Sequence, residues 1–315
     1  MWSDRARATG SAPGSRKPAF TPAFLLLFLW RGCTRPGRQF RYHAAMMTIE
    51  HDKVVELMRE AAAREIMPLW RNLEQHHVME KGVGDVVTAA DQACEAFLAD
   101  ELTALIPGSL LVGEESYAAD PGVLGALKSD RPVWVVDPLD GTRNFARHEP
   151  PIAVMVCLVQ ANQTLASWIL DPLEDTVLSA ERGAGAWLEG QRLQVPSAEK
   201  PVNQMNGAVM VRYLPEDLRD YALSMRDRLG GAVGTGCAGH DYRLLATGQV
   251  DFLFYYRTLV WDHAPGVLII EEAGGWARRY DGQRYLPDSD ALGLICSNSS
   301  VGWQKVRDTV LPAEV

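Results

Sequence analysis

The chain contains few cysteines and no hydrophobic run long enough to cross a membrane. Its five cysteines are scattered over 315 residues without a C-x-x-C pair, which argues against a disulfide framework or a zinc knuckle and leaves reduced thiols as the expectation. The apolar run 23–30 has eight residues, whereas a membrane-spanning helix needs about 20. A G-x-S-x-G sequence is also absent, so the nucleophile elbow of serine hydrolases is excluded.

Basic residues are concentrated at the N-terminus. Residues 1–47 hold eight Lys or Arg and one acid, a charge of +7, so the remaining 268 residues carry −16 of the total of −9. A body this acidic repels phosphate backbones, which disfavours nucleic acids and anionic membranes as partners. We therefore expect a cytoplasmic protein that binds neither of them.

The basic leader, residues 1–46, is compatible with three interpretations. Translation could begin at Met46 or Met47, which would leave the leader untranslated or unstructured. An Arg-rich, acid-poor segment is also typical of a transit or signal peptide, although no small-x-small cleavage site follows the apolar run. The third interpretation is a functional tail. We expect a disordered and dispensable leader.

The first half of the body, residues 47–195, combines helical and strand patterns. Apolar residues recur at helical spacing from Thr48 to Trp70, with Pro68 as the expected end, and again from Thr88 to Leu105. Short apolar runs then predict five strands. These strands are 110–113, 133–137, 152–159, 165–170 and 176–180. This half is predicted to consist of helices packed on an antiparallel sheet.

After Pro196, predicted strands and helices alternate. The strands are 208–211, 232–235, 251–256 and 293–296, and the helices are 215–229, 240–247, 263–273 and a last one that starts at 300. Such alternation indicates helices that cover a sheet. The predicted fold class is therefore an α+β half, residues 47–195, followed by a mixed α/β half, residues 196–315.

The segment 134–145, WVVDPLDGTRNF, contains several groups that could bind a cation or a phosphate. An apolar strand ends at Asp137, the following proline is expected to turn the chain, and Asp140 is expected to precede a helix. Two carboxylates across a turn can converge on a hard cation, which prefers oxygen ligands, and the amides of Gly141 and Thr142 could hold a phosphate. A D-x-x-D-G segment taken alone is more often a structural turn with solvated acids.

Three further segments place a carboxylate at the end of an apolar element. They are GDVVTAAD at 84–91, GEES at 113–116 and WDHAPGVLIIEEAGG at 261–275. Taken singly, each acid is more often a helix cap or a surface residue. Together with 134–145, these segments resemble, in order and spacing, four motifs of the magnesium-dependent, lithium-sensitive inositol monophosphatase family, and the resemblance extends from about residue 47 to the C-terminus.

The resemblance implies the layered αβαβα sugar-phosphatase fold and two to three Mg²⁺ in each active site. By position, Glu114, Asp137 and the backbone carbonyl of Leu139 would hold the first ion, and Asp137, Asp140 and Asp262 would hold the second. Glu114 would also reach a third, weaker ion. Bound cations would explain how an acidic body accepts an anionic substrate.

The same resemblance implies catalytic roles for Asp85 and Thr142. Thr142, oriented by Asp85, would activate the water that attacks phosphorus, and the amides of Gly141 and Thr142 would bind the phosphate. Such a site follows the two-metal logic of in-line displacement. The family also implies lithium inhibition and a homodimer.

Residues that contact the alcohol decide which ester is cleaved. The family commonly has G-S-A-A or G-T-A-A where this chain has GCAG at 236–239, which leaves Ala238 as the substrate-lining alanine. The inositol-cleaving members resembled here carry a Glu seven residues before the motif Asp262, where this chain has Tyr255. Arg257 lies nearby and could bind a second anionic group on the substrate. An aromatic strand end with a solvated Arg accounts for the same residues equally well.

We therefore expect Mg²⁺-dependent hydrolysis of a small phosphorylated metabolite, with inositol monophosphate as the default substrate. One alternative is a phosphatase for histidinol phosphate, a sugar bisphosphate or a 3′-phosphoadenosine nucleotide. A less favoured alternative is a regulatory protein that binds a partner through the same fold, although such a protein need not keep an entire set of metal ligands.

Overall fold

The computed structural model describes residues 49–71, 78–82, 85–197, 199–232 and 234–313, without the side chains of 71, 78–82, 85–88 and 232. The leader predicted for residues 1–46 lies outside these described residues. Thr48–Val315 form one compact unit, and the division of this unit into halves at residues 195 and 196 stays a prediction.

Seven strands form the larger sheet, in the order β3-β4-β5-β6-β7-β8-β9. The central strands are apolar and buried, as expected for strands covered on both faces. The strands are β3 Leu110–Gly113, β4 Val133–Asp140, β5 Ala153–Gln160, β6 Gln163–Asp171, β7 Thr176–Glu181, β8 Gly185–Leu188 and β9 Gln191–Arg192. All neighbours are antiparallel except β3 and β4, which are parallel because a helical crossover joins them. The prediction of a purely antiparallel sheet is wrong at this pair.

Five strands form the second sheet, in the order β11-β10-β12-β14-β13. Its strands are β10 Asn206–Val209, β11 Gly231–Ala232, β12 Phe252–Tyr255, β13 Trp276–Arg278 and β14 Leu294–Ser297. The sheet is mixed: β10 pairs in parallel with β11 and β12, while β14 pairs antiparallel with β12 and β13. A separate antiparallel pair consists of β1 Val78–Gly82 and β2 Asp85–Thr88.

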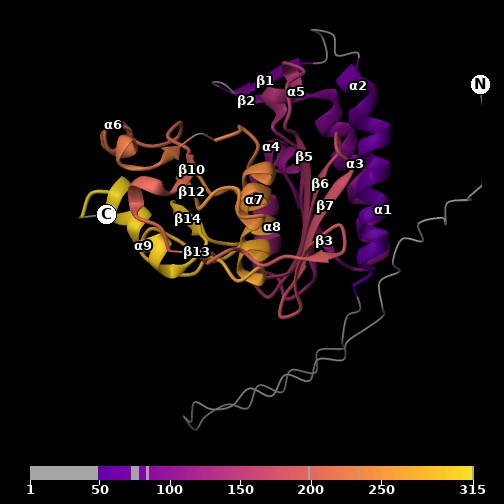
Figure 1. The fold of residues 1–315 in the computed structure, drawn as a ribbon. Coiled ribbons are helices and arrows are strands. Elements are labelled where there is room, and N and C mark those ends of the chain that lie inside the picture. Colours follow the sequence, from indigo (N-terminus) through magenta and orange to yellow (C-terminus); the bar gives the residue numbers. More distant parts are fainter. Residues whose placement is uncertain (1–48, 72–77, 83–84, 198, 233, 314–315) are drawn as a thin grey trace, which may run out of the picture. The chain divides into compact units, whose positions relative to one another are not determined.

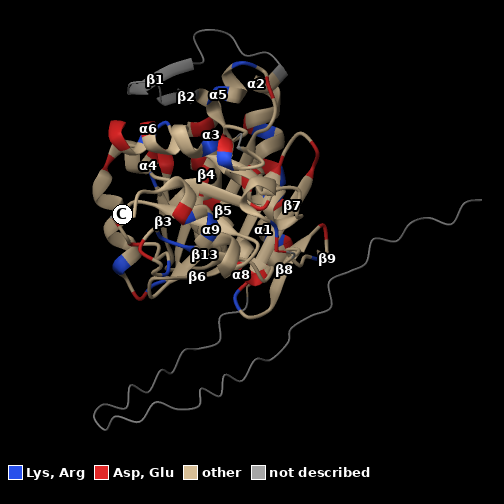
Figure 2. Cartoon of the chain, turned by 60° about the vertical axis from the view of Figure 1, so that its left-hand side comes forward, with Lys and Arg blue, Asp and Glu red and all other residues tan. Residues whose placement is uncertain are grey.

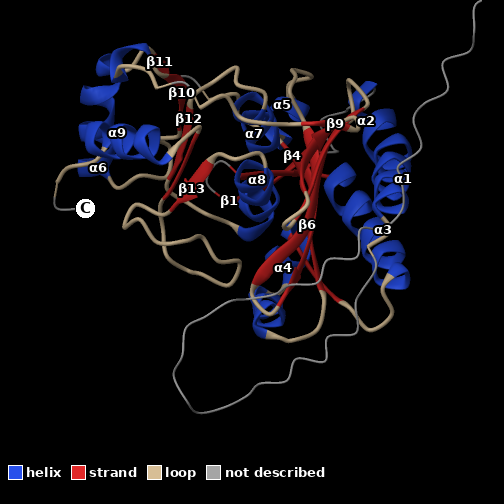
Figure 3. Ribbon diagram, turned by 60° about the horizontal axis from the view of Figure 1, so that its bottom comes forward, coloured by secondary structure: helices blue, strands red, loops and turns tan. Residues whose placement is uncertain are grey.

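Helices cover and separate the two sheets. Figure 1 shows α1, α2 and α3 on one face of the larger sheet, α7 and α8 between the sheets, and α6 and α9 beyond the smaller sheet; Figure 3 agrees. The helices are α1 His51–Ala61, α2 Met67–Arg71, α3 Ala89–Leu105, α4 Glu114–Ala119, α5 Thr142–Ala146, α6 Glu216–Met225, α7 Ala238–Ala246, α8 Val260–Glu272 and α9 Ser300–Val310. This arrangement confirms the predicted αβαβα layers.

Helix α8 forms the centre of the core. Almost all of its residues are buried, as expected for a helix with a sheet on either side. Gly266 lets α8 approach α7 closely, since a Cβ at this position would lie 2.1 Å from the ring of Tyr242. Within the described residues, no helix is both long and apolar enough to span a bilayer. Figure 2 shows acidic and basic positions spread over many elements.

The first helical segment does not end at Pro68 as predicted. Helix α1 passes into a short π-helix, Ala62–Ile66, and the chain continues as α2. A proline lacks an N–H group and crowds the carbonyl of the preceding turn, but the first turn of a helix tolerates it. Pro68 occupies the second position of α2, where the π-helix has already changed the hydrogen-bond pattern.

Candidate active site

Strand β4 delivers two carboxylates to one side of the sheet through a bulge. Asp137 pairs with Met155 of β5 and Asp140 pairs with Ala153, so three steps along β4 match two along β5. In a regular strand, residues three apart face opposite sides of the sheet, whereas the extra residue of a bulge restores a common side. Pro138 therefore lies inside the strand, and the predicted turn at this residue is wrong.

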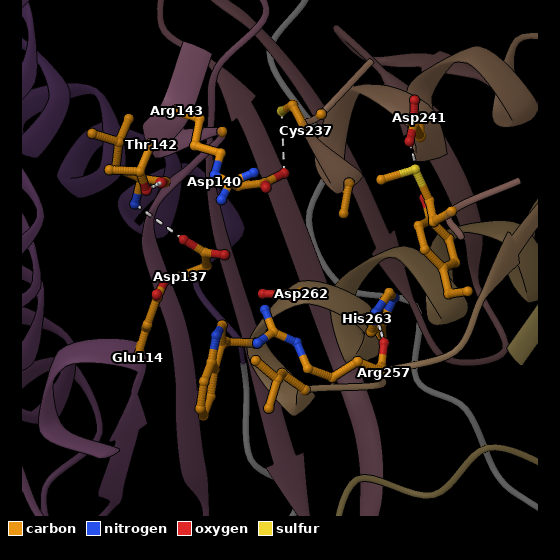
Figure 4. Close-up of a pocket in the computed structure, with 18 of the residues that line it drawn as sticks. Glu114, Asp137, Asp140, Thr142, Arg143, Cys237, Asp241, Arg257, Asp262 and His263 are labelled. Atoms are coloured by element: carbon orange, nitrogen blue, oxygen red, sulfur yellow. Dashed lines mark hydrogen bonds between the residues drawn. The ribbon is translucent and has the colours of Figure 1, made fainter. Parts of the chain in front are cut away.

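A pocket of about 640 Å³ opens beside this end of β4. It brings together every predicted site residue whose side chain is described (Figure 4). These residues are Glu114, Asp137, Leu139, Asp140, Gly141, Thr142, Ala238, Tyr255, Arg257 and Asp262. The remaining one, Asp85, stands in β2, and its side chain lies outside the described residues.

Burial and neighbouring carboxylates raise the pKa of Asp137. Asp137 is 1% exposed. Burial, followed by the charges of Glu114, Asp140, Asp262 and Asp91, raises its pKa well above the ordinary value of 3.8. The ionised form of Asp137 is therefore disfavoured, and a cation bound among these acids would stabilise it.

The donor set suits a hard cation. The predicted ligands are carboxylate and carbonyl oxygens, which are the ligands that Mg²⁺ and Ca²⁺ prefer. Among the described side chains, no group of three or more Asp, Glu, His or Cys is arranged to hold a metal ion by itself. Mg²⁺ usually keeps several waters and also binds substrate phosphates, so it does not need a closed protein cage. The acids that line this pocket fit such an ion.

Asp140 is fixed by the start of α7. Its Oδ2 atom accepts hydrogen bonds from the amide of Gly239 at 2.6 Å and from the thiol of Cys237 at 3.1 Å. Burial raises the pKa of Asp140, and these hydrogen bonds partly offset that effect. Burial and the charge of Asp140 raise the pKa of the Cys237 thiol as well, so the thiol remains a neutral donor. This thiol occupies the position of the Ser or Thr in the more common family sequence.

Thr142 is the first residue of α5 and lines the same pocket as Asp137 and Asp140. Its hydroxyl oxygen lies 2.9 Å from the carbonyl oxygen of Leu139 and 3.2 Å from Oδ1 of Asp91. A hydroxyl has one proton to donate and keeps lone pairs that can accept. The preceding Gly141 has a φ of +86°, and a Cβ there would lie 2.9 Å from the carbonyl oxygen of Pro151. Both observations require glycine at this position.

Glu95 of α3, which the sequence analysis did not single out, holds the segment that carries Glu114. Its carboxylate accepts hydrogen bonds from the amides of Glu115 and Ser116, both at 2.7 Å, and so caps α4. A Cβ at Gly113 would lie 2.3 Å from this carboxylate, so the first glycine of the GEES motif makes room for the cap. An acid within a helical pattern gives no sequence signal of this role, because α4 meets Glu95 only in the folded chain.

Asp241 of α7 is a second buried acid that the sequence analysis missed. Its Oδ1 atom accepts hydrogen bonds from the amide and hydroxyl of Thr235, at 3.1 and 2.8 Å, and its Oδ2 atom accepts one from the hydroxyl of Tyr255 at 3.3 Å. Burial raises the pKa of Asp241 to about 6, although these hydrogen bonds lower it in part. Tyr255 is 5% exposed and is the last residue of β12, as the interpretation of an aromatic strand end predicts.

Replacing Glu95 with Gln is expected to destabilise the fold by about 2 kcal/mol, because one amide N–H of α4 would face an NH₂ group in place of a carboxylate oxygen. Urea denaturation followed by tryptophan fluorescence measures the effect. Glu101→Gln, on an exposed position of the same helix, is the matched control and should change stability by less than about 0.5 kcal/mol. Equal stabilities of Glu95→Gln and the wild type would contradict the capping role.

Replacing Asp241 with Asn is expected to remove a pH-dependent loss in the free energy of unfolding. Between the ordinary pKa of 3.8 and the folded-state pKa of about 6, the folded chain holds a proton that the unfolded chain has lost, so a rise in pH through this window favours unfolding. The loss approaches about 3 kcal/mol above pH 6. The variant should therefore gain stability relative to the wild type between about pH 4 and pH 7, as measured by urea denaturation in EDTA. A difference that does not change with pH would rule out this assignment.

Comparison with known proteins identifies the family. The model of the inositol monophosphatase family matches residues 50–312. The inositol-1-monophosphatase of Rhizobium meliloti is 30% identical over 224 residues, which cover 70% of this chain and 81% of that protein. The Nus factor SuhB of Escherichia coli is 32% identical over 210 residues, 64% of this chain and 75% of that protein. The crystal structure of extragenic suppressor protein suhB from Bartonella henselae matches with a TM-score of 0.71 and 26% identity, over 82% of this chain and 97% of that one. The chain belongs to the inositol monophosphatase family and is a phosphoric monoester hydrolase.

Proposed function

We propose that the chain hydrolyses a small phosphate monoester in a magnesium-dependent reaction, with inositol monophosphate as the reference substrate. The observation that carries this proposal is the buried Asp137 with the carboxylates that surround it and raise its pKa, in the same pocket as the Thr142 hydroxyl. The printed name of the Rhizobium relative, inositol-1-monophosphatase, supports the reference substrate.

The pocket acids would divide two Mg²⁺ ions among them. Glu114, Asp137 and the carbonyl of Leu139 would hold one, and Asp137, Asp140 and Asp262 the other, with a third, weaker ion also reached by Glu114. When bound, Mg²⁺ supplies Lewis acidity that lowers the pKa of a water molecule and stabilises negative charge on the leaving alcohol oxygen. The acids alone would repel an anionic substrate.

Thr142 is the residue proposed to receive the proton of the attacking water. Its oxygen can take a proton from the water as its own proton passes to the carboxylate of Asp91, and that proton can return through Thr142 and water to the alcohol oxygen that leaves. As the water oxygen forms its bond to phosphorus, the bond from phosphorus to the alcohol oxygen breaks, and the amides of Gly141 and Thr142 would bind the phosphate oxygens. The 3.2 Å approach of Asp91 to the hydroxyl supports Asp91 as the acid partner, while Asp85 stays a prediction from the resemblance.

Other small esters remain alternatives because Tyr255 replaces the expected Glu. Histidinol phosphate, a sugar bisphosphate and a 3′-phosphoadenosine nucleotide each present a different alcohol to the same phosphate site. Lithium inhibition, a homodimer and a cytoplasmic location also stay predictions.

A regulatory role is the second candidate, and the names of the relatives favour it. The Escherichia coli relative is called a Nus factor and the Bartonella structure an extragenic suppressor protein. Neither of these two names describes a phosphatase. A chain that acts only through a partner has no need of the acids that line the pocket, and their presence favours hydrolysis.

Replacing Asp137 with Asn is expected to lower turnover by about three orders of magnitude or more, because the proposed bridging ligand loses its charge. Phosphate release from inositol 1-phosphate, histidinol phosphate, fructose 1,6-bisphosphate and 3′-phosphoadenosine 5′-phosphate, each with Mg²⁺ or EDTA, is the measurement.

The fold of the Asp137→Asn variant should remain intact, since Asn keeps the shape of Asp and can accept the 3.1 Å hydrogen bond from the amide of Leu139. Thermal unfolding in EDTA checks this point. Asp100→Asn, on an exposed position of α3, is the matched control and should retain full activity. Turnover of Asp137→Asn close to that of the wild type, or turnover that persists in EDTA, would refute the metal-dependent mechanism.

A further inference from the structure

We infer that Asn144 is a positioning residue that fixes Asp140, a proposed cation ligand, relative to Thr142. The inference rests on the proposed phosphatase function and concerns a residue of the same pocket that the predicted site did not include. Asn144 belongs to α5, the helix that begins with Thr142. It acts through the turn 235–238, which it ties to α5, and not through contact with the substrate.

The side-chain amide of Asn144 joins three segments of the chain. Its Nδ2 atom donates to the carbonyl oxygen of Pro151 at 2.9 Å and to the carbonyl oxygen of Thr235 at 3.0 Å. An amide NH₂ group has two protons to donate, so both are used within the protein and neither is left for a substrate. Asn144 therefore connects α5 to the segment before β5 and to the turn before α7.

Gly236 shows how closely this turn approaches Asn144. The φ of Gly236 is +79°, in the region that favours glycine. A Cβ atom at this position would lie 3.3 Å from Oδ1 of Asn144, which is tighter than an ordinary van der Waals contact. The side chain of Asn144 thus contacts the turn through both its nitrogen and its oxygen.

The same turn leads directly into the groups that hold Asp140. The thiol of Cys237 and the amide of Gly239 both donate to Oδ2 of Asp140, at 3.1 and 2.6 Å, and Figure 4 shows the first of these hydrogen bonds. The turn also packs against the residue before Thr142, since a Cβ at Gly141 would lie 3.2 Å from the Cβ of Cys237. A movement of the turn would therefore displace Asp140 relative to Thr142.

Asp140 and Thr142 have different tasks in the proposed reaction. Thr142 would receive the proton of the attacking water, whereas Asp140 would help to hold the cation that stabilises negative charge on the leaving oxygen. Asn144 shares a helix with Thr142, and its amide holds the turn that fixes Asp140. Loss of this amide should therefore impair the stabilisation of the leaving group most.

Esters with different leaving groups test the inference. An alkyl alcohol leaves with its negative charge on one oxygen, whereas p-nitrophenolate spreads the charge over its ring and needs less stabilisation. The alkyl ester is whichever of inositol 1-phosphate, histidinol phosphate and fructose 1,6-bisphosphate the wild type cleaves fastest with Mg²⁺. Asn144→Ala should lower kcat/KM by about 100-fold for this ester and by less than about tenfold for p-nitrophenyl phosphate.

Gly236→Ala is a second variant that disturbs the same contact and leaves Asn144 in place. Its methyl group would press on Oδ1 of Asn144, so the loss should again be greater for the alkyl ester. If Asn144→Ala does not fold, Gly236→Ala provides the same comparison.

Magnesium binding gives a measurement that does not depend on turnover. Isothermal titration calorimetry of metal-free Asn144→Ala should show a Mg²⁺ affinity about tenfold below that of the wild type, as is typical when a residue that orients a metal ligand is removed.

Asp251→Asn is the matched control for a purely structural effect. Asp251 is 4% exposed, accepts hydrogen bonds from Lys200 and from the amide of Asn206, and lies outside the described pocket lining. Both variants should unfold at a lower urea concentration than the wild type. Only Asn144→Ala should change the ratio of kcat/KM between the two esters and the Mg²⁺ affinity.

Equal losses on both esters in Asn144→Ala, or an unchanged Mg²⁺ affinity, would overturn the inference and leave the phosphatase function standing. A similar change of the ratio in Asp251→Asn would also overturn it, because the ratio would then follow stability. Absence of turnover of every ester by the wild type would instead overturn the proposed function, and the inference with it.

Discussion

The repulsion between the buried Asp137 and the carboxylates around it is the constraint on which the site depends. Asp137 is almost fully buried, and the charges of four neighbouring acids raise its pKa in addition to burial. Burying a charge without a partner costs several kcal/mol in typical proteins, and burying several together costs more. Such an arrangement is retained only where something positive compensates it. Divalent cations are positive groups that oxygen ligands of this kind can bind.

The fold holds these acids from several directions. The bulge in β4 turns Asp137 and Asp140 to one side, and the start of α7 fixes Asp140 through the amide of Gly239 and the thiol of Cys237. Glu95, itself an acid, caps α4. Asp137 and Asp140 are therefore positioned by the backbone amides of Leu139 and Gly239, which is the preorganisation that electrostatic catalysis requires.

The local part of this design could be predicted from the sequence. The apolar run that ends at Asp137, followed by Gly141 and Thr142, predicts a strand that places a carboxylate at the rim of a pocket. Four such motifs in order predicted the family and the layered fold, and the comparisons and the structure confirm both. Four acids on these motifs, Glu114, Asp137, Asp140 and Asp262, line one pocket.

The remaining features depend on contacts between distant segments, and no local pattern contains them. The bulge depends on the register of β4 against β5. The sequence of β4 alone does not contain that register, and it therefore predicted a turn at Pro138. Glu95 and Asp241 resemble ordinary helix residues until α4, Thr235 and Tyr255 are placed beside them. The same holds for the ring of Tyr213, which contacts the guanidinium group of Arg257 across 44 residues of chain.

Magnesium binding to the metal-free protein tests the central claim most directly. Isothermal titration calorimetry in two buffers of different ionisation enthalpy gives the affinity and the number of protons released. The account predicts binding with a net proton release that increases as the pH is lowered, because a cation displaces protons from acids whose pKa is raised. It also predicts that Asp137→Asn weakens this binding by about tenfold or more. Absence of binding in the wild type, or an unchanged affinity in the variant, would contradict the account.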